Sequence, residues 1–130
     1  MGVLTRLFHA GYESTGDLML RRYRHLLGTA PIESIEQAHA EAFGDLHEPL
    51  RSAIYEELSR GSGTGERPLS SEPATLARSA SRAERRVPGS IESTLRAADD
   101  RGGFGGSLLE PVVSQVASSP LVSAFLPWNS

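Results

Sequence analysis

The stretch TAPIESIEQAHAEAFGDL, residues 29–46, indicates the fold class of this chain. Its apolar residues recur three or four positions apart, while glutamates occupy the other faces, and this periodicity is typical of an amphipathic helix. The apolar face consists of Ile35, Ala38, His39, Ala42, Phe43 and Leu46. The early glutamates also suit the positive end of a helix dipole. The stretch therefore predicts a helix that packs one face against a core.

Helical patterns continue on both sides of this stretch. Residues 18–27 precede it as a helix with an arginine-rich polar face, which Gly28 is well placed to end. Pro49 suits the first turn of a following helix, because its missing N–H is not needed there. Further helices are predicted at residues 74–86 and 90–98, and no segment alternates apolar and polar residues as a strand would. We therefore predict an all-α protein, a small bundle of short helices with flexible linkers and an apolar C-terminal helix or tail.

Composition divides the chain into five regions. Leucine, isoleucine, valine and phenylalanine are concentrated in the first 60 residues and again after residue 103, whereas glycine, proline and serine dominate between them. Such a middle region cannot build a core alone. We expect an N-terminal amphipathic segment (1–17), a helical core (18–60), a flexible linker (61–73), an Arg-rich helical segment (74–101) and a Gly-rich hinge with an apolar tail (102–130).

The sequence GSGTGER, residues 61–67, resembles a phosphate-binding loop but also fits a tether between helices. A phosphate loop needs a lysine after its glycines, with a strand before it and a helix directly after it. All 13 basic residues of this chain are arginine. Glu66 would repel phosphate, and Pro68 prevents a helix from starting directly after the glycines. We therefore interpret the stretch as a tether.

Overall composition excludes several function classes. The formal net charge of −3 at pH 7 provides no general attraction to nucleic acid. The absence of cysteine excludes disulfides, thiolate zinc sites and thiol nucleophiles. The first residues lack the continuous apolar run of a secretory signal, so we expect a cytoplasmic protein. We recognise no catalytic constellation and predict no cofactor.

Glu36 and His39 have the one spacing in this chain that is typical of a metal site. Glu-x-x-His places both side chains on one helix face, as di-iron helical bundles require. Such a centre also needs a second copy of the motif and further glutamates, and the motif occurs once here. The alternative, which we favour, is that His39 lies at the edge of the apolar face with Glu36 solvated or hydrogen-bonded to it.

Four arginines of the Arg-rich segment form a candidate interaction surface. Neighbouring helical turns would align them into a basic stripe in which Glu84 is the only acid. The stripe consists of Arg78, Arg82, Arg85 and Arg86. It suits an acidic protein partner or anionic lipid, whereas nucleic acid is disfavoured by the overall charge. The alternative is a solvated face with local ion pairs.

The tail from residue 102 to residue 130 is nearly uncharged and about as long as a membrane span. Glu110, Gln115 and several prolines and serines make an unassisted span costly. Ser107 and Glu110 also fit a capping box for a helix behind them. Three alternatives stay open: docking on the N-terminal helices, lying in a membrane interface, and binding another chain. The candidate contact residues are Leu109, Val112, Val113, Val116, Phe125 and Trp128.

Several blocks of sequence occur in order between residues 21 and 95. They are Tyr23 with Leu26 and Leu27, followed by residues 29–31, 35–39, 76–78, 82–84 and 86–89. In these blocks the chain resembles a family of small actinobacterial proteins labelled as cation-transporting ATPases. The resemblance implies a shared helical module and transfers no catalytic residue, because neither a nucleotide loop nor a lysine-containing aspartyl-phosphate motif is present.

The sequence supports two function hypotheses. The leading one is a non-enzymatic interaction or adaptor protein that acts on a protein partner or on itself, with attachment to an anionic membrane surface as a variant. The alternative is an ATPase or a metal-dependent enzyme, as the family label implies.

Overall fold

The computed structural model describes residues 14–61 and 67–126, and these residues form an all-α bundle without a strand. Its helices are α2 (Thr15–Thr29), α3 (Ile32–Gly44), α4 (Glu48–Gly61), α5 (Pro73–Arg86), α6 (Ser90–Gly102) and α7 (Leu109–Ala117), followed by the short 3₁₀ helix η1 (Ser123–Phe125). The predicted fold class is confirmed. The N-terminal segment that we expected to be amphipathic lies mostly outside the described residues, and so does most of GSGTGER. Trp128 also lies outside them.

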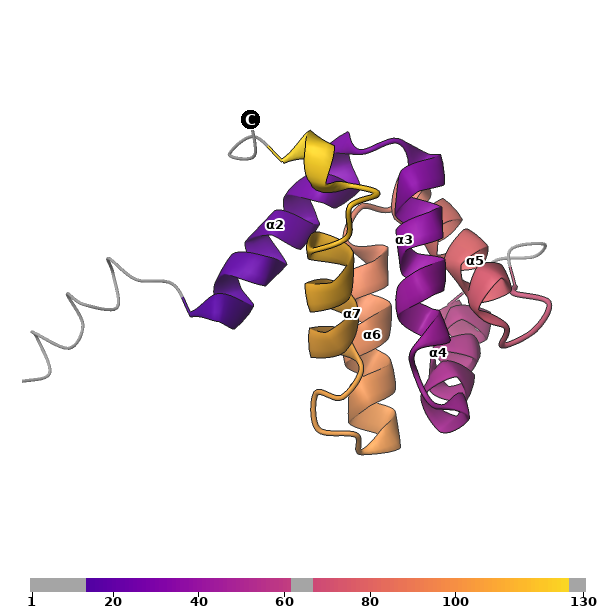
Figure 1. The fold of residues 1–130 in the computed structure, drawn as a ribbon. Helices are drawn as coiled ribbons and strands as arrows, with labels where there is room; N and C mark the ends of the chain where they lie inside the picture. The colour runs from indigo at the N-terminus through magenta and orange to yellow at the C-terminus, as the bar shows by residue number, and fades with distance from the viewer. Residues whose placement is uncertain (1–13, 62–66, 127–130) are drawn as a thin grey trace, which may run out of the picture.

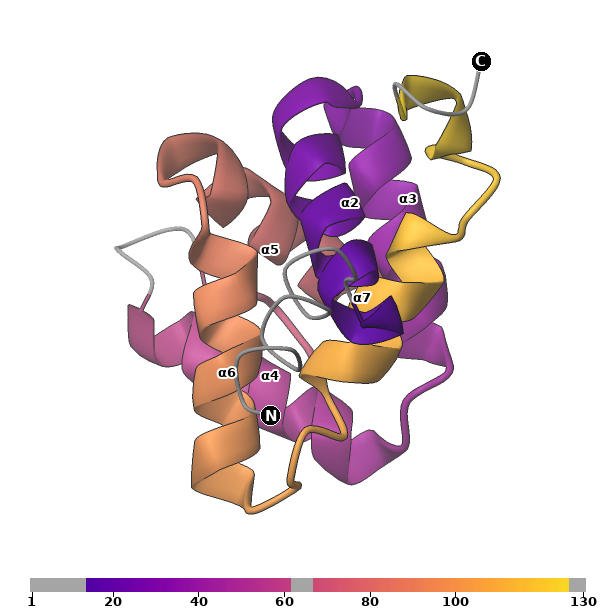
Figure 2. The ribbon, with the colours of Figure 1, turned by 90° about the vertical axis from the view of Figure 1, so that its left-hand side faces the viewer.

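Helix α3 lies at the centre of the bundle, between α5 on one side and α7 on the other (Figure 1). The α3–α5 contact is the most extensive, and the α2–α7 and α4–α6 pairs complete the packing. Figure 2 shows α2 against α7, the helix with which it has its main contact. The chain therefore returns from α5 onward to cover the helices that come first in the sequence.

The core draws apolar side chains from every α-helix of the bundle. Its largest members include Tyr23, Leu26, Phe43, Ile54, Leu76, Leu95 and Val112, each at most 1% exposed. The predicted apolar face of α3 is buried as expected, and Leu76 and Ala80 of α5 are buried as well. Burying each large side chain contributes about 1.5–3 kcal/mol. Apolar periodicity thus identified the faces that hold the bundle together.

Two helices run further than their sequence patterns predicted. Helix α2 continues through Gly28 and ends at Thr29, because Pro31 favours an extended conformation in the residue before it. Ala30 accordingly has extended backbone angles, and its N–H donates to the Leu26 carbonyl. Helix α6 continues past residue 98 to Gly102, where Gly103 adopts a left-handed conformation with φ of 67° that glycine tolerates.

Two buried carboxylates each cap the N-terminus of the helix that follows their own. Glu84 of α5 accepts hydrogen bonds from the backbone N–H groups of Gly89 (2.8 Å) and Ile91 (3.0 Å) at the start of α6. Asp99 of α6 accepts from the N–H groups of Leu108 and Leu109 at the start of α7, both at 3.1 Å. Unpaired N–H groups at a helix start need such acceptors, and the charge suits the helix dipole.

The predicted capping box of Ser107 and Glu110 does not form. The Ser107 hydroxyl instead donates to the Phe104 carbonyl at 2.7 Å. Asp99 takes the capping position because α6 runs on past residue 98 and brings this carboxylate to the start of α7.

Replacing Asp99 by alanine is expected to lower the free energy of unfolding by about 2 kcal/mol. The change leaves the Leu108 N–H, which is buried, without its acceptor. Urea denaturation followed by circular dichroism measures the loss. Asp100→Ala is the matched control, because Asp100 is the exposed neighbour on the same helix. Equal losses in both variants would contradict a capping role for Asp99.

Candidate functional site

The C-terminal segment packs on the N-terminal helices, which is one of the three alternatives that the sequence left open. Helix α7 contacts α2 and α3, and Val112, Val113 and Val116 are at most 3% exposed. These valines therefore contact this chain's own core rather than forming a free surface. Leu109 is half-buried and Phe125 is 38% exposed. None of the described helices combines the length and the apolar character needed to cross a membrane.

Glu36 and His39 do not meet at a common site. Both ring nitrogens of His39 are engaged, with Nδ1 2.7 Å from the Ile35 carbonyl and Nε2 2.7 Å from the Tyr23 hydroxyl. Glu36 instead accepts a hydrogen bond from Arg78 at 3.3 Å. Among the residues that the structure describes, no three His, Asp or Glu side chains lie together as metal ligands would.

Tyr23 and His39 form a buried polar link between α2 and α3. Since a carbonyl only accepts, His39 donates from Nδ1 to the Ile35 carbonyl, and its Nε2 accepts a hydrogen bond from the Tyr23 hydroxyl. Burial lowers the pKa of His39 to about 4. Burial also raises the pKa of Tyr23 well above its usual value, and the negative charges of Glu84 and Glu92 add to this rise. Both side chains are therefore neutral near pH 7, so the pair holds two helices together.

Tyr23 is the partner of His39 that sequence reasoning missed. The two residues are 16 positions apart and lie on different helices. The sequence placed Tyr23 in the predicted helix of residues 18–27. That placement does not indicate which other helix the Tyr23 hydroxyl would contact.

The four predicted stripe arginines are all exposed. Arg78 and Arg82 line one groove, while Arg85 lines a second groove and Arg86 a third. Steps of three or four positions keep the four side chains on one face of α5, because an α-helix has 3.6 residues per turn. Of the four, Arg78 and Arg82 line the same groove.

The groove beside Arg78 and Arg82, which we call the basic groove, has a volume of about 290 Å³. It is lined by Arg67, Pro68, Leu69, Ala74, Thr75, Arg78, Ser79 and Arg82. No carboxylate is among these residues. Pro68 is buried and fixes the segment that precedes α5, whereas Leu69 is 94% exposed. The basic groove therefore combines three guanidinium groups with one exposed apolar side chain.

The arginines of the basic groove are weakly neutralised. Arg78 has one ion pair, with Glu36, and its side chain is still 65% exposed. Neither Arg67 nor Arg82 forms an ion pair within the part of the chain that the structure describes. An exposed single contact of this kind contributes about 0–1 kcal/mol. All three arginines are therefore available to an external anion at little cost.

Sequence reasoning missed the contribution of Arg67 and Leu69 to this site. Both lie in residues 61–73, which their glycine, serine and proline content marked as a flexible linker. The available signal in the sequence was the Pro68–Leu69 pair, which is apolar within an otherwise polar segment. In the structure Pro68 is buried.

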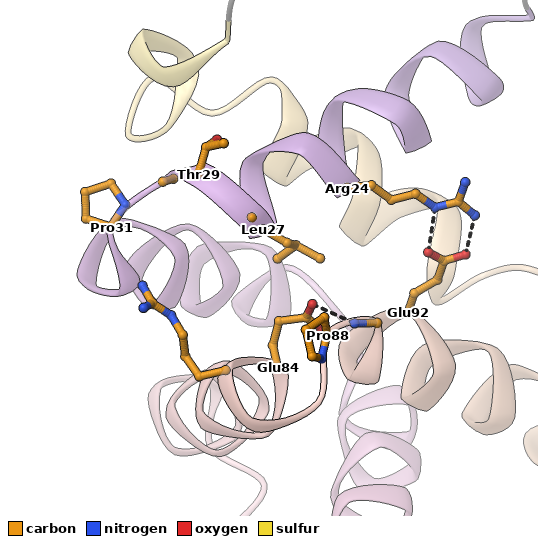
Figure 3. Close-up of a pocket in the computed structure, with 11 residues that line it drawn as sticks. Arg24, Leu27, Thr29, Pro31, Glu84, Pro88 and Glu92 are labelled. Carbon is orange, nitrogen blue, oxygen red and sulfur yellow. Dashed lines mark hydrogen bonds and ion pairs between the residues drawn. The ribbon is translucent and has the colours of Figure 1, made fainter.

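A larger groove of about 610 Å³ lies between the end of α2 and the turn that joins α5 to α6 (Figure 3). Arg24 makes a double ion pair across it with Glu92, with N–O distances of 2.9 and 2.8 Å. The hydrogen bonds from Arg24 and Arg96 lower the pKa of Glu92 to about 2. This ion pair connects α2 to α6.

No family model, curated protein or solved structure matches this chain. The resemblance to proteins labelled as cation-transporting ATPases therefore stays a prediction, and the grooves with their side chains are the features that bear on function.

Proposed function

We propose that this protein is a non-enzymatic helical interaction module of the cytoplasm whose basic groove binds an acidic segment of a partner protein. The observation that carries the proposal is the gathering of Arg67, Arg78 and Arg82 around one groove without a carboxylate in its lining. The whole chain has a net charge of −3, so the positive charge of this groove is a local exception to the negative charge of the protein. Such complementarity guides association and selects the partner.

The size of the basic groove supports a protein segment as its occupant. Small-molecule sites measure about 300–1,000 Å³ and enclose most of their ligand. At about 290 Å³ the basic groove lies at the lower end of that range, and its three arginines are exposed, so it suits a few side chains of a larger partner. Arginine is enriched at protein interfaces, and it pairs with carboxylates through two parallel hydrogen bonds. Exposed Leu69 adds an apolar contact at the rim.

Attachment to an anionic membrane is the competing outcome, since the same arginines would attract acidic headgroups. A helix that lies in a membrane interface needs a broad apolar face beside its basic residues. Among the described residues that line the basic groove, Leu69 is the one large apolar side chain that is strongly exposed. The valines of α7 are buried against α2 and α3. These observations favour an acidic protein segment over a membrane.

The test is a titration of the full chain against a fluorescein-labelled peptide of Asp and Glu residues around one leucine. Fluorescence anisotropy measures the affinity at low salt, and a peptide with Asn and Gln in place of the acids controls for charge. Replacing Arg67, Arg78 and Arg82 together by glutamine is expected to weaken binding about tenfold, because exposed pairs contribute about 0.2–1 kcal/mol each. Added salt should weaken binding of the unmodified chain as well.

The matched control replaces Arg60, Arg96 and Arg101 by glutamine. These arginines are also exposed and lie outside the basic groove, so the control changes the net charge by the same amount. The proposal requires this control to bind the acidic peptide as the unmodified chain does. Equal weakening of peptide binding in both variants would show that the effect comes from the overall charge of the protein and not from the basic groove. Binding to phosphatidylserine vesicles without binding to the peptide would assign the arginines to a membrane.

A further inference from the structure

The larger groove between α2 and the α5–α6 turn differs from the basic groove in size and in lining. Its volume of about 610 Å³ lies within the range of small-molecule sites. Figure 3 shows Leu27 of α2 above Pro88 of the turn, with Pro31 at the other end of the groove. Leu27 is half-buried, and both prolines are exposed. The groove therefore offers apolar walls that an organic ligand of moderate size can contact.

The charged side chains of this groove are engaged within the protein, with one exception. Glu92 accepts from Arg24 and Arg96, and both oxygens of Glu84 accept backbone N–H groups. Arg85 is exposed, and it forms no ion pair in residues 14–61 or 67–126. A cationic ligand would have to displace an existing partner of Glu84 or Glu92, whereas an anionic ligand finds Arg85 available.

We propose that this groove is a second site, which binds a small organic carboxylate. The carboxylate pairs with the Arg85 guanidinium, and the apolar body of the ligand lies against Leu27, Pro31 and Pro88. Guanidinium groups match the planar geometry of carboxylates, and apolar contacts supply affinity that a single exposed ion pair lacks. This site is separate from the basic groove, since Arg85 lines the larger groove and is not part of the basic one.

The test uses the ¹⁵N-labelled full chain, with phenylacetate as the probe and uncharged phenylacetamide as its matched analogue. Phenylacetate should shift the amide signals of Leu27, Gly28 and Gly89, which line the groove. It should bind about fivefold more tightly than phenylacetamide, because the exposed pair with Arg85 contributes modestly. Absence of shifts at these amides up to millimolar probe would overturn the proposal.

Two glutamine variants locate the charge that the probe recognises. Arg85→Gln should weaken phenylacetate binding about fivefold and leave phenylacetamide binding unchanged. Arg101→Gln is the control, because it removes the same charge at an exposed position outside both grooves. Arg101→Gln should leave both affinities unchanged. If phenylacetate bound Arg85→Gln as tightly as the unmodified chain, or if Arg101→Gln caused the same loss, the assignment to Arg85 would be wrong.

Discussion

Replacing Val116 by aspartate is expected to lower the free energy of unfolding by about 4 kcal/mol or more, enough to unfold much of the protein at 37 °C. Val116 is 1% exposed and belongs to the core that α7 shares with α2 and α3. An aspartate there buries a carboxylate without a partner and removes apolar contacts. Urea denaturation followed by circular dichroism measures the loss.

Ser114→Asp is the matched control for this prediction. Ser114 lies on the same helix but is exposed, so the same charge should change the free energy of unfolding by less than about 0.5 kcal/mol. If Val116→Asp were as stable as this control, α7 would not be a part of the core.

Acid is expected to destabilise the fold from about pH 6.5 downward, before most carboxylates titrate. Burial holds the pKa of His39 at about 4 in the folded protein, against 6.5 for an ordinary histidine. The contribution of His39 is fully present above pH 6.5. It is lost as the pH falls towards 4, because the unfolded chain then binds a proton that the folded chain does not. The gap corresponds to about 3 kcal/mol.

His39→Gln tests this assignment, because an amide can donate to the Ile35 carbonyl and accept from Tyr23 without titrating. The free energy of unfolding of this variant, from urea denaturation at several pH values, should change little between pH 6.5 and pH 4.5. His47→Gln is the control, since His47 is exposed and its replacement should leave the pH dependence intact. A pH dependence that survives in His39→Gln would assign the acid sensitivity to another group.

A second loss is expected at lower pH, when Glu92 is protonated. Its ion pairs with Arg24 and Arg96 hold the pKa of Glu92 at about 2, below the ordinary value of 4.5. This contribution is present above pH 4.5 and is lost as the pH falls through 2.

Local patterns predicted the helices because each helix buries one continuous face. The spacing of Ile35, Ala38 and Phe43 on α3, and of Leu76 and Ala80 on α5, reflects that burial directly. The class of the fold could therefore be predicted from residues a few positions apart.

The candidate site could be predicted only in part, because its geometry depends on residues that are distant in the sequence. The partner of His39 lies on another helix, and the capping of α7 by Asp99 depends on where α6 ends. Arg67 joins Arg78 and Arg82 only because the segment before α5 folds back along it. The spacing of the arginines on α5 indicated a basic face but did not reveal that Arg67, from the segment before the helix, would line a groove with two of them.

The sharpest test of the proposed interaction module is a map of amide shifts in the ¹⁵N-labelled full chain during titration with the acidic peptide. We expect changes concentrated on residues of the basic groove, in particular Arg67, Leu69, Arg78 and Arg82, with the signals of α2 and α7 unaffected. Changes concentrated on α2 and α7, or no changes at saturating peptide, would show that the basic groove is not the binding site.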